Sequence, residues 1–258
     1  MNRRAFIMMA AAAPLADQAK AAGAVSAGDY LSRTRYLEVG HPRIEAIVSS
    51  VAPRSLSNVE RAVALFTYVR DRIPFGFASG FWNQTATEVL DAGIGYCNTK
   101  STLLTTLLRT AGIPARQVFV DIDAEVLDGL IQPGTPYLDH SYVEVFLEGA
   151  WRRTDAYVVD QALFEAAHQR VQAESRRFGY GVHVQGTMVW NGTDQTFSQY
   201  NLNADHPLGT RTWGVYEDIG AFYAGAEAPW NRLNALVRAG FGLLASDANA
   251  KADTLRKA

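Results

Sequence analysis

The sequence predicts an α+β fold in which a cysteine-bearing helix packs on an antiparallel β-sheet. Apolar residues recur at helical spacing between about Cys97 and Thr110. Three segments of alternating polar and apolar residues follow: Gln117 to Val126, His140 to Leu147, and Ala150 to Tyr157. Glu148-Gly149, between the last two segments, is typical of a two-residue hairpin turn, so those strands are expected to be antiparallel.

Composition narrows the range of functions. With 258 residues, of which 48% are apolar, the chain can form one large domain or a core with a substantial extension. The net charge of −2 and the lack of a basic stripe argue against nucleic acid as a partner. The single cysteine, Cys97, can form neither an internal disulfide nor a thiolate zinc site alone.

Residues 1–24 have the features of an export signal. Arg3-Arg4 gives a basic start, and Ala5 to Ala16 is an apolar run too short to span a bilayer. Asn2 to Ile7 resembles the twin-arginine export signal. We therefore expect an exported protein, periplasmic or secreted, with no stable membrane span in the mature chain.

The rest of the chain divides into a catalytic core, residues 25–160, and a mixed C-terminal extension, residues 161–258, packed on it. Further helices are expected over 42–51, from the capping box at Ser57 to Pro74, over 160–178 and over 231–244. A Gly- and aromatic-rich loop runs from Pro74 to Thr85, between the helix that begins at Ser57 and the helix that begins at Cys97. After Leu244 the tail is charged and is expected to fray.

Cys97 occupies a position that suits a reactive thiol. It follows Gly93, Gly95 and Tyr96 and stands at the predicted start of its helix. Unpaired backbone N–H groups at a helix N-terminus favour an anion, and hence the thiolate over the thiol. Thr99, Lys100 and Thr106 are expected to lie off the apolar stripe of this helix.

His140 and Asp155 are the expected base and the group that orients it. If Glu148-Gly149 forms the hairpin loop, Leu147 pairs with Ala150 and Tyr142 pairs with Asp155. His140 and Asp155 then lie on one face of the sheet as diagonal neighbours, about 7–8 Å apart at the backbone. A three-residue loop would place them on opposite faces.

Several motifs together resemble the transglutaminase-like superfamily. They are Ala86 to Leu90, the Gly93 to Cys97 run, Leu107 to Arg116, His140 to Val145, and Trp151 to Asp155. The resemblance covers about residues 60–160 and keeps the family's order of Cys, His and Asp. It implies a papain-like core with Cys97, His140 and Asp155 as the catalytic residues. Arylamine N-acetyltransferases share that order, but the segment from Gly112 to Arg116 favours the transglutaminase-like interpretation.

The predicted function is thiol-dependent acyl transfer through a thioester, giving either amide and peptide hydrolysis or transglutaminase-type transfer. The substrate is expected to be a peptide or protein, with cell-wall peptides included. The oxyanion would be held by the Cys97 backbone N–H and by a second donor, for which Trp82, Asn83 and Gln84 are candidates. Alternatives are a non-catalytic binding module that retains the fold, and a small-molecule amidase or cyclase.

No cofactor or metal is expected. Asp121, Asp123 and Glu125 repeat with the period of two that fits the solvated face of a strand, and no loop has ligand spacing. Among the other histidines, His183 is in a Gly-rich loop that could border the cleft.

Overall fold

The computed structural model describes residues 26–201, 212–232 and 235–258. The helices are η1 (Ala27–Leu31), α1 (Pro42–Val51), α2 (Asn58–Arg72), α3 (Ala86–Ala92), α4 (Cys97–Thr110), η2 (Ala124–Leu127), α5 (Gln161–Ala173), α6 (Ile219–Ala224), α7 (Pro229–Arg232) and α8 (Ala235–Leu255). The strands are β1 (Ala115–Asp123), β2 (Tyr137–Leu147), β3 (Ala150–Thr154), β4 (Phe178–Gly179), β5 (Val182–His183) and β6 (Thr212–Tyr216). The predicted export signal, residues 1–24, lies outside the described residues. Within the described ranges, every helix is too short or too polar to cross a membrane.

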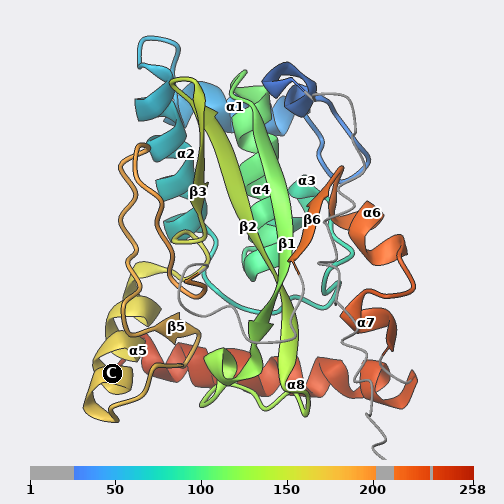
Figure 1. The fold of residues 1–258 in the computed structure, drawn as a ribbon, viewed down its shortest axis with the longest axis vertical. Helices are drawn as coiled ribbons and strands as arrows, with labels where there is room; N and C mark the ends of the chain where they lie inside the picture. Colours follow the sequence, from blue (N-terminus) through green and yellow to red (C-terminus); the bar gives the residue numbers. More distant parts are fainter. Residues whose placement is uncertain (1–25, 202–211, 233–234) are drawn as a thin grey trace, which may run out of the picture.

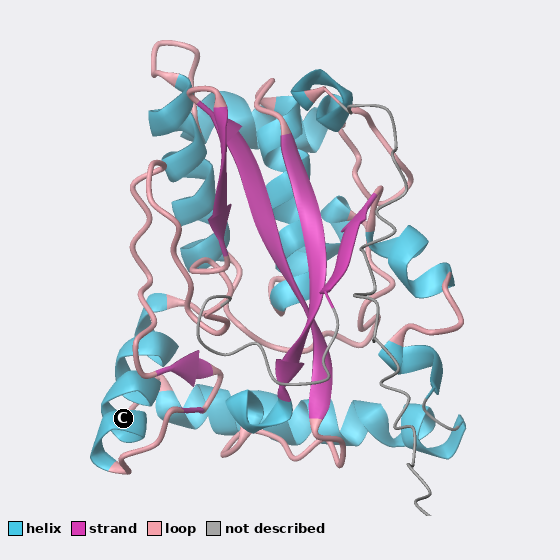
Figure 2. Cartoon of the chain, viewed as in Figure 1, coloured by secondary structure: helices cyan, strands magenta, loops and turns pink. Residues whose placement is uncertain are grey.

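An antiparallel sheet with the strand order β3-β2-β1-β6 forms the centre of the fold (Figures 1 and 2). Leu147 pairs with Ala150, which confirms the predicted hairpin. Two of the predicted strand ends were wrong. β1 ends at Asp123, whose carboxylate accepts a hydrogen bond from the Glu125 N–H and starts the short helix η2. β3 ends at Thr154 rather than Tyr157, because the chain turns away immediately after it.

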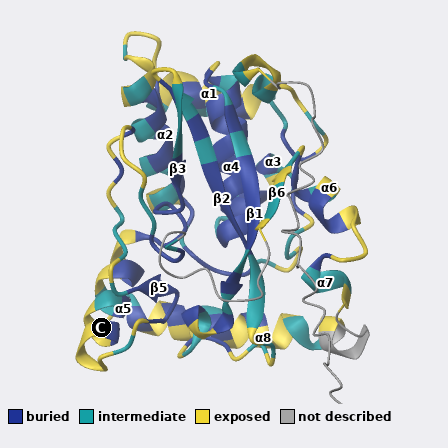
Figure 3. Ribbon diagram, viewed as in Figure 1, coloured by how far each residue is buried: buried dark blue, intermediate teal, exposed yellow. Residues whose placement is uncertain are grey.

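Helix α4 covers one face of this sheet and is itself enclosed (Figures 1 and 3). Its bounds are those predicted, and Gly112, with a φ of 79°, follows its C-terminus in the left-handed conformation. Thr99, Lys100 and Thr106, which the sequence places off the apolar stripe of this helix, are fully buried as well, because α4 is enclosed by its neighbours. A hydroxyl such as that of Thr106 donates to the carbonyl one turn earlier, so burial leaves it paired.

The core between α4 and the sheet is closed by α1, α2 and α3, which pack on the other sides of α4. Both α1 and α2 begin where the sequence predicts. Ser57 caps α2 in a capping box with Glu60, and the Arg61 side chain donates to the carbonyls of Ala52 and Ala111. Arg61 therefore ties α2 to the ends of α1 and α4.

The residues after 160 pack on the central sheet and extend it. β6 pairs with β1 in the central sheet, and α8 crosses the end of the sheet where β1 ends and β2 begins (Figure 1). The predicted frayed tail is wrong, because α8 continues to Leu255. Its Ala245, Ala248 and Ala252 are buried. The predicted helix over 160–178 is shorter than expected and ends at Ala173.

Candidate active site

Just before α4, the backbone of Gly95 lies so close to the first turn of the helix that only glycine fits there. A Cβ atom on Gly95 would lie 2.9 Å from Lys100 Cγ and 2.9 Å from Thr99 Oγ1. Thr99 Oγ1 in turn accepts a hydrogen bond from the Tyr96 N–H at 3.1 Å. This tight entry makes Cys97 the first residue of the helix.

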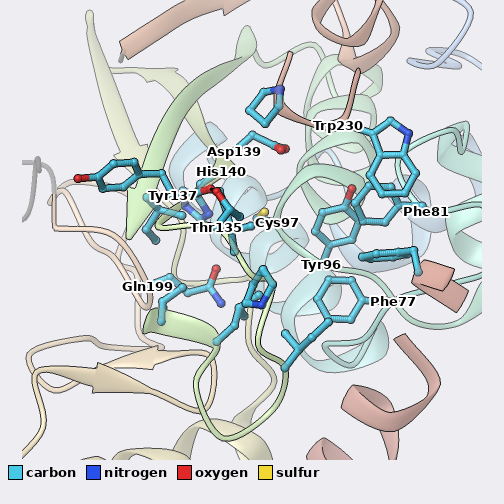
Figure 4. Close-up of a pocket in the computed structure, with 18 of the residues that line it drawn as sticks. Phe77, Phe81, Tyr96, Cys97, Thr135, Tyr137, Asp139, His140, Gln199 and Trp230 are labelled. Atoms are coloured by element: carbon cyan, nitrogen blue, oxygen red, sulfur yellow. The ribbon is translucent and has the colours of Figure 1, made fainter. Parts of the chain in front are cut away.

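Cys97 and His140 line the same pocket (Figure 4). The Cys97 side chain is almost buried, with 7% of its residue surface exposed. Burial raises the pKa of the thiol well above its usual value, the Ser141 backbone N–H offsets this only in part, and the negative charge of Asp139 raises it further. The expectation that the helix N-terminus favours the thiolate is therefore not met. Burial therefore favours the thiol over the thiolate, so attack by the sulfur calls for a base.

His140 lies on β2 and meets Asp155 just beyond the end of β3. His140 Nε2 is 2.9 Å from Asp155 Oδ2, and both side chains are buried. The predicted register brings them onto one face, since Val143 pairs with Thr154 and Asp155 is the next residue. Because Nε2 is engaged by the carboxylate, Nδ1 is the ring nitrogen left for proton exchange with a thiol.

The backbone of residues 198–200 holds the Asp155 carboxylate in place. Oδ1 accepts from the Ser198 N–H at 2.5 Å, and Oδ2 accepts from the Tyr200 N–H at 3.0 Å. Arg153 anchors the segment by donating to the Tyr200 carbonyl at 2.7 Å. This segment was not predicted from the sequence, because backbone N–H donors leave no residue pattern that could reveal them.

Asp139, a half-buried residue, places a second carboxylate at the pocket. Its Oδ2 accepts from Asn98 Nδ2 at 2.7 Å and from Tyr223 Oη at 2.5 Å. Burial raises the pKa of Asp139, because charge is disfavoured away from water. Asp139 was not among the predicted site residues. Strand alternation points it to the face of the sheet opposite to that of His140, and there it meets Asn98 of α4.

The three candidates for the second oxyanion donor do not line the pocket. The Trp82 ring stacks on Tyr223 with its centroid 4.5 Å away, and the Gln84 amide lies 3.5 Å from the Glu88 carbonyl. Asn83 Oδ1 accepts a hydrogen bond from the Tyr36 hydroxyl. The loop that carries these residues folds onto α3 and α6 instead of turning its polar groups toward Cys97.

The remaining candidates have structural partners. Asp121 accepts from the Trp213 indole N–H, and Asp123 caps the turn at Glu125. His183 is buried, and its Nδ1 accepts from the Gln185 N–H. Burial lowers the pKa of His183 to about 4. Within the described ranges, no three His, Cys, Asp or Glu side chains gather as a metal site would require.

Residues 45–156 match the family model of the transglutaminase-like superfamily. A crystal structure of a candidate cysteine protease from Cytophaga hutchinsonii is similar at 16% sequence identity and a TM-score of 0.40. The similarity covers 48% of this chain and 39% of that protein. Comparison with curated proteins gave no match.

Proposed function

We propose that the protein is a thiol-dependent acyl-transfer enzyme with Cys97 as nucleophile, His140 as general base and acid, and Asp155 as the residue that orients His140. The observation that carries the proposal is the buried hydrogen bond of 2.9 Å between His140 and Asp155 at a pocket that Cys97 also lines. Nucleophilic catalysis of acyl transfer requires these three roles at one cavity.

In the first half of the reaction, His140 Nδ1 takes the thiol proton as Cys97 Sγ attacks the carbonyl carbon of an amide or ester. The C–N or C–O bond then breaks, and the leaving nitrogen or oxygen receives that proton from His140. In the second half, water or an amine gives a proton to His140 and attacks the thioester carbon, and the proton returns to the sulfur. Proton transfer of this kind contributes about 10²- to 10⁴-fold to the rate.

The raised pKa of the Cys97 thiol supports activation by His140 over a preformed thiolate. The tightly held Asp155 supports that role, because it keeps Nε2 protonated and leaves the Nδ1 lone pair for the proton of the thiol. The Cys97 backbone N–H at the start of α4 is the donor that we propose for the oxyanion.

The test is the rate at which iodoacetamide alkylates Cys97 at neutral pH. We expect His140→Ala to slow alkylation at least tenfold, because the buried thiol loses its base. The matched control is His41→Ala, since His41 caps α1 through the Arg43 N–H. Equal rates in wild type and His140→Ala would contradict the proposal and favour a binding module that only retains the fold.

Products from a peptide substrate identify the acyl acceptor. Free acid indicates transfer to water, and an amide formed with an added primary amine indicates transglutaminase-type transfer. We propose export of the mature enzyme on the basis of residues 1–24, with peptides outside the cytoplasm, including cell-wall peptides, as the substrates.

A further inference from the structure

The pocket beside Cys97 has mostly apolar walls and a volume of about 150 Å³. Its apolar lining includes Phe75, Phe77, Phe81, Ile122, Trp230 and Phe241. An apolar cavity of this size in another protein stays dry and binds benzene. The space therefore fits one compact apolar group, of about the size of a phenyl ring or a branched aliphatic side chain.

Rigid rings from distant parts of the sequence form one wall of the pocket (Figure 4). Phe81 lies with its ring centroid 4.3 Å from Trp230 and 4.3 Å from Phe241, and it stacks on Tyr96 at 5.1 Å. Aromatic rings at these separations attract one another beyond their buried area. α7 and α8 thus complete a site whose thiol belongs to α4, and they fix its shape.

The polar groups at the pocket do not favour an anionic or amide-bearing ligand. The two side chains that donate to Asp139, those of Asn98 and Tyr223, are both neutral, so its negative charge is not cancelled by them and repels a carboxylate. Gln199 Nε2 already donates to the Gly181 carbonyl at 2.8 Å. A carboxamide side chain in the apolar part of the pocket would leave its hydrogen-bonding groups without partners, which is costly.

We propose that this pocket selects acyl substrates that carry an uncharged, phenyl-sized apolar group next to the reacting carbonyl. The inference deepens the proposed function, since it names the substrate class of the same site. It differs from a preference for a glutamine side chain next to a reacting backbone carbonyl, which would place an amide among the rings. The occupant is the side chain of the acyl group, and the reacting carbonyl faces Cys97 and His140.

Binding to the Cys97→Ser protein tests the proposal without requiring catalysis. The ligands are N-acetyl-phenylalanine amide, N-acetyl-glutamine amide and N-acetyl-glutamic acid amide, and the readout is titration calorimetry. We expect the phenylalanine ligand to bind roughly 10- to 200-fold more tightly than either of the others, the range by which small side-chain differences are discriminated in a pocket. Equal binding of the three, or tighter binding of the glutamine ligand, would overturn the proposal.

Two adjacent leucines of α8 provide a matched pair of variants. Leu244 lines the pocket and is 42% exposed, whereas Leu243 is 80% exposed and is not part of the lining. We expect Leu244→Glu to weaken binding of the phenylalanine ligand at least fivefold and Leu243→Glu to leave it unchanged. Equal effects of the two substitutions would contradict the assignment of this wall.

The two proposals fail in different experiments. If the phenylalanine ligand binds selectively but alkylation does not depend on His140, the catalytic proposal is wrong and the binding preference stands. Alkylation that depends on His140, together with equal binding of the three ligands, would retain the thiol chemistry and remove the apolar preference.

Discussion

Asp155 lies between the His140 ring and the backbone of residues 198–200. Asp155 Oδ2 lies 2.9 Å from His140 Nε2 and accepts a hydrogen bond from the Tyr200 N–H at 3.0 Å. Asp155 Oδ1 accepts one from the Ser198 N–H. Each donor that surrounds Asp155 therefore meets a carboxylate oxygen that can accept its hydrogen bond. No uncharged isostere reproduces this arrangement, because an amide replaces one acceptor with a donor.

Asp155→Asn is predicted to lower the rate of Cys97 acylation by an activated ester at least 100-fold. The NH₂ group of the asparagine must face either a backbone N–H or the His140 ring. Facing the ring, it favours the tautomer in which Nε2 is not protonated, which is the wrong one for accepting the thiol proton at Nδ1. Stopped-flow release of p-nitrophenol measures the rate. The control is Asp194→Asn, at an exposed carboxylate of the loop that leads to residues 198–200. A change of less than threefold in Asp155→Asn would show that the orienting role is absent.

Asp139→Asn is predicted to lower the pKa of the Cys97 thiol. The negative charge of Asp139 is one of the causes that raise this pKa, second to burial among the causes that act in this direction. The pH profile of alkylation by iodoacetamide should therefore move to lower pH. Circular dichroism checks that the fold is retained, since Asn can still pair with Asn98 and Tyr223. An unmoved profile, or one displaced to higher pH, would contradict this electrostatic account.

Lys100 is predicted to make stability depend on pH. Burial lowers the pKa of Lys100 from 10.5 to about 7, although its Nζ donates to the Arg70 and Val158 carbonyls. Between pH 7 and pH 10 the unfolded chain therefore binds more protons than the folded one, and the free energy of unfolding rises with pH.

From pH 7 to pH 10 the free energy of unfolding should rise in wild type. In Lys100→Met, which lacks the titrating group, we expect this rise to be smaller by several kcal/mol. Urea titrations at pH 7 and pH 10 measure the two increments. Other groups titrate in both proteins and cancel in the comparison. Equal increments would mean that the ammonium group is not desolvated as the structure indicates.

Arg256→Ala is predicted to destabilise the protein by about 2–3 kcal/mol, because it leaves a largely buried carboxylate without its cation. Arg256 Nη2 donates to Asp160 Oδ2 at 2.8 Å and to the Phe75 carbonyl at 2.6 Å. Chemical denaturation gives the value. Lys251→Ala is the control, since Lys251 makes only an exposed pair with Asp247 on the same helix and should cost at most about 0.5 kcal/mol. Similar losses in the two variants would contradict the anchoring role of Arg256.

Local patterns in the sequence predict the parts of the site that depend on short-range rules. The period of the leucines, with Gly112 at the end, gives α4 and its first residue, Cys97. The two-residue hairpin turn gives the register that brings His140 and Asp155 together. Both features depend on neighbouring residues, so counting along the chain is sufficient.

Long-range partners could not be predicted in the same way. The charges of Lys251, Asp253 and Arg256 suggested a solvated tail, whereas Ala245, Ala248, Ala252 and Leu255 form the buried stripe of α8. Small apolar residues give a weak periodic signal, and the Arg256–Asp160 pair spans 96 positions. The pKa of Cys97 depends on desolvation by the whole fold, which a helix-end argument does not include.

The central claim is a covalent acyl intermediate on Cys97, and intact-mass spectrometry tests it most directly. After incubation with p-nitrophenyl phenylacetate, we predict a mass increase of one phenylacetyl group in wild type. It should be removed by hydroxylamine, as a thioester is, and absent in Cys97→Ala. A wild-type mass that never increases, or the same adduct on Cys97→Ala, would contradict the account.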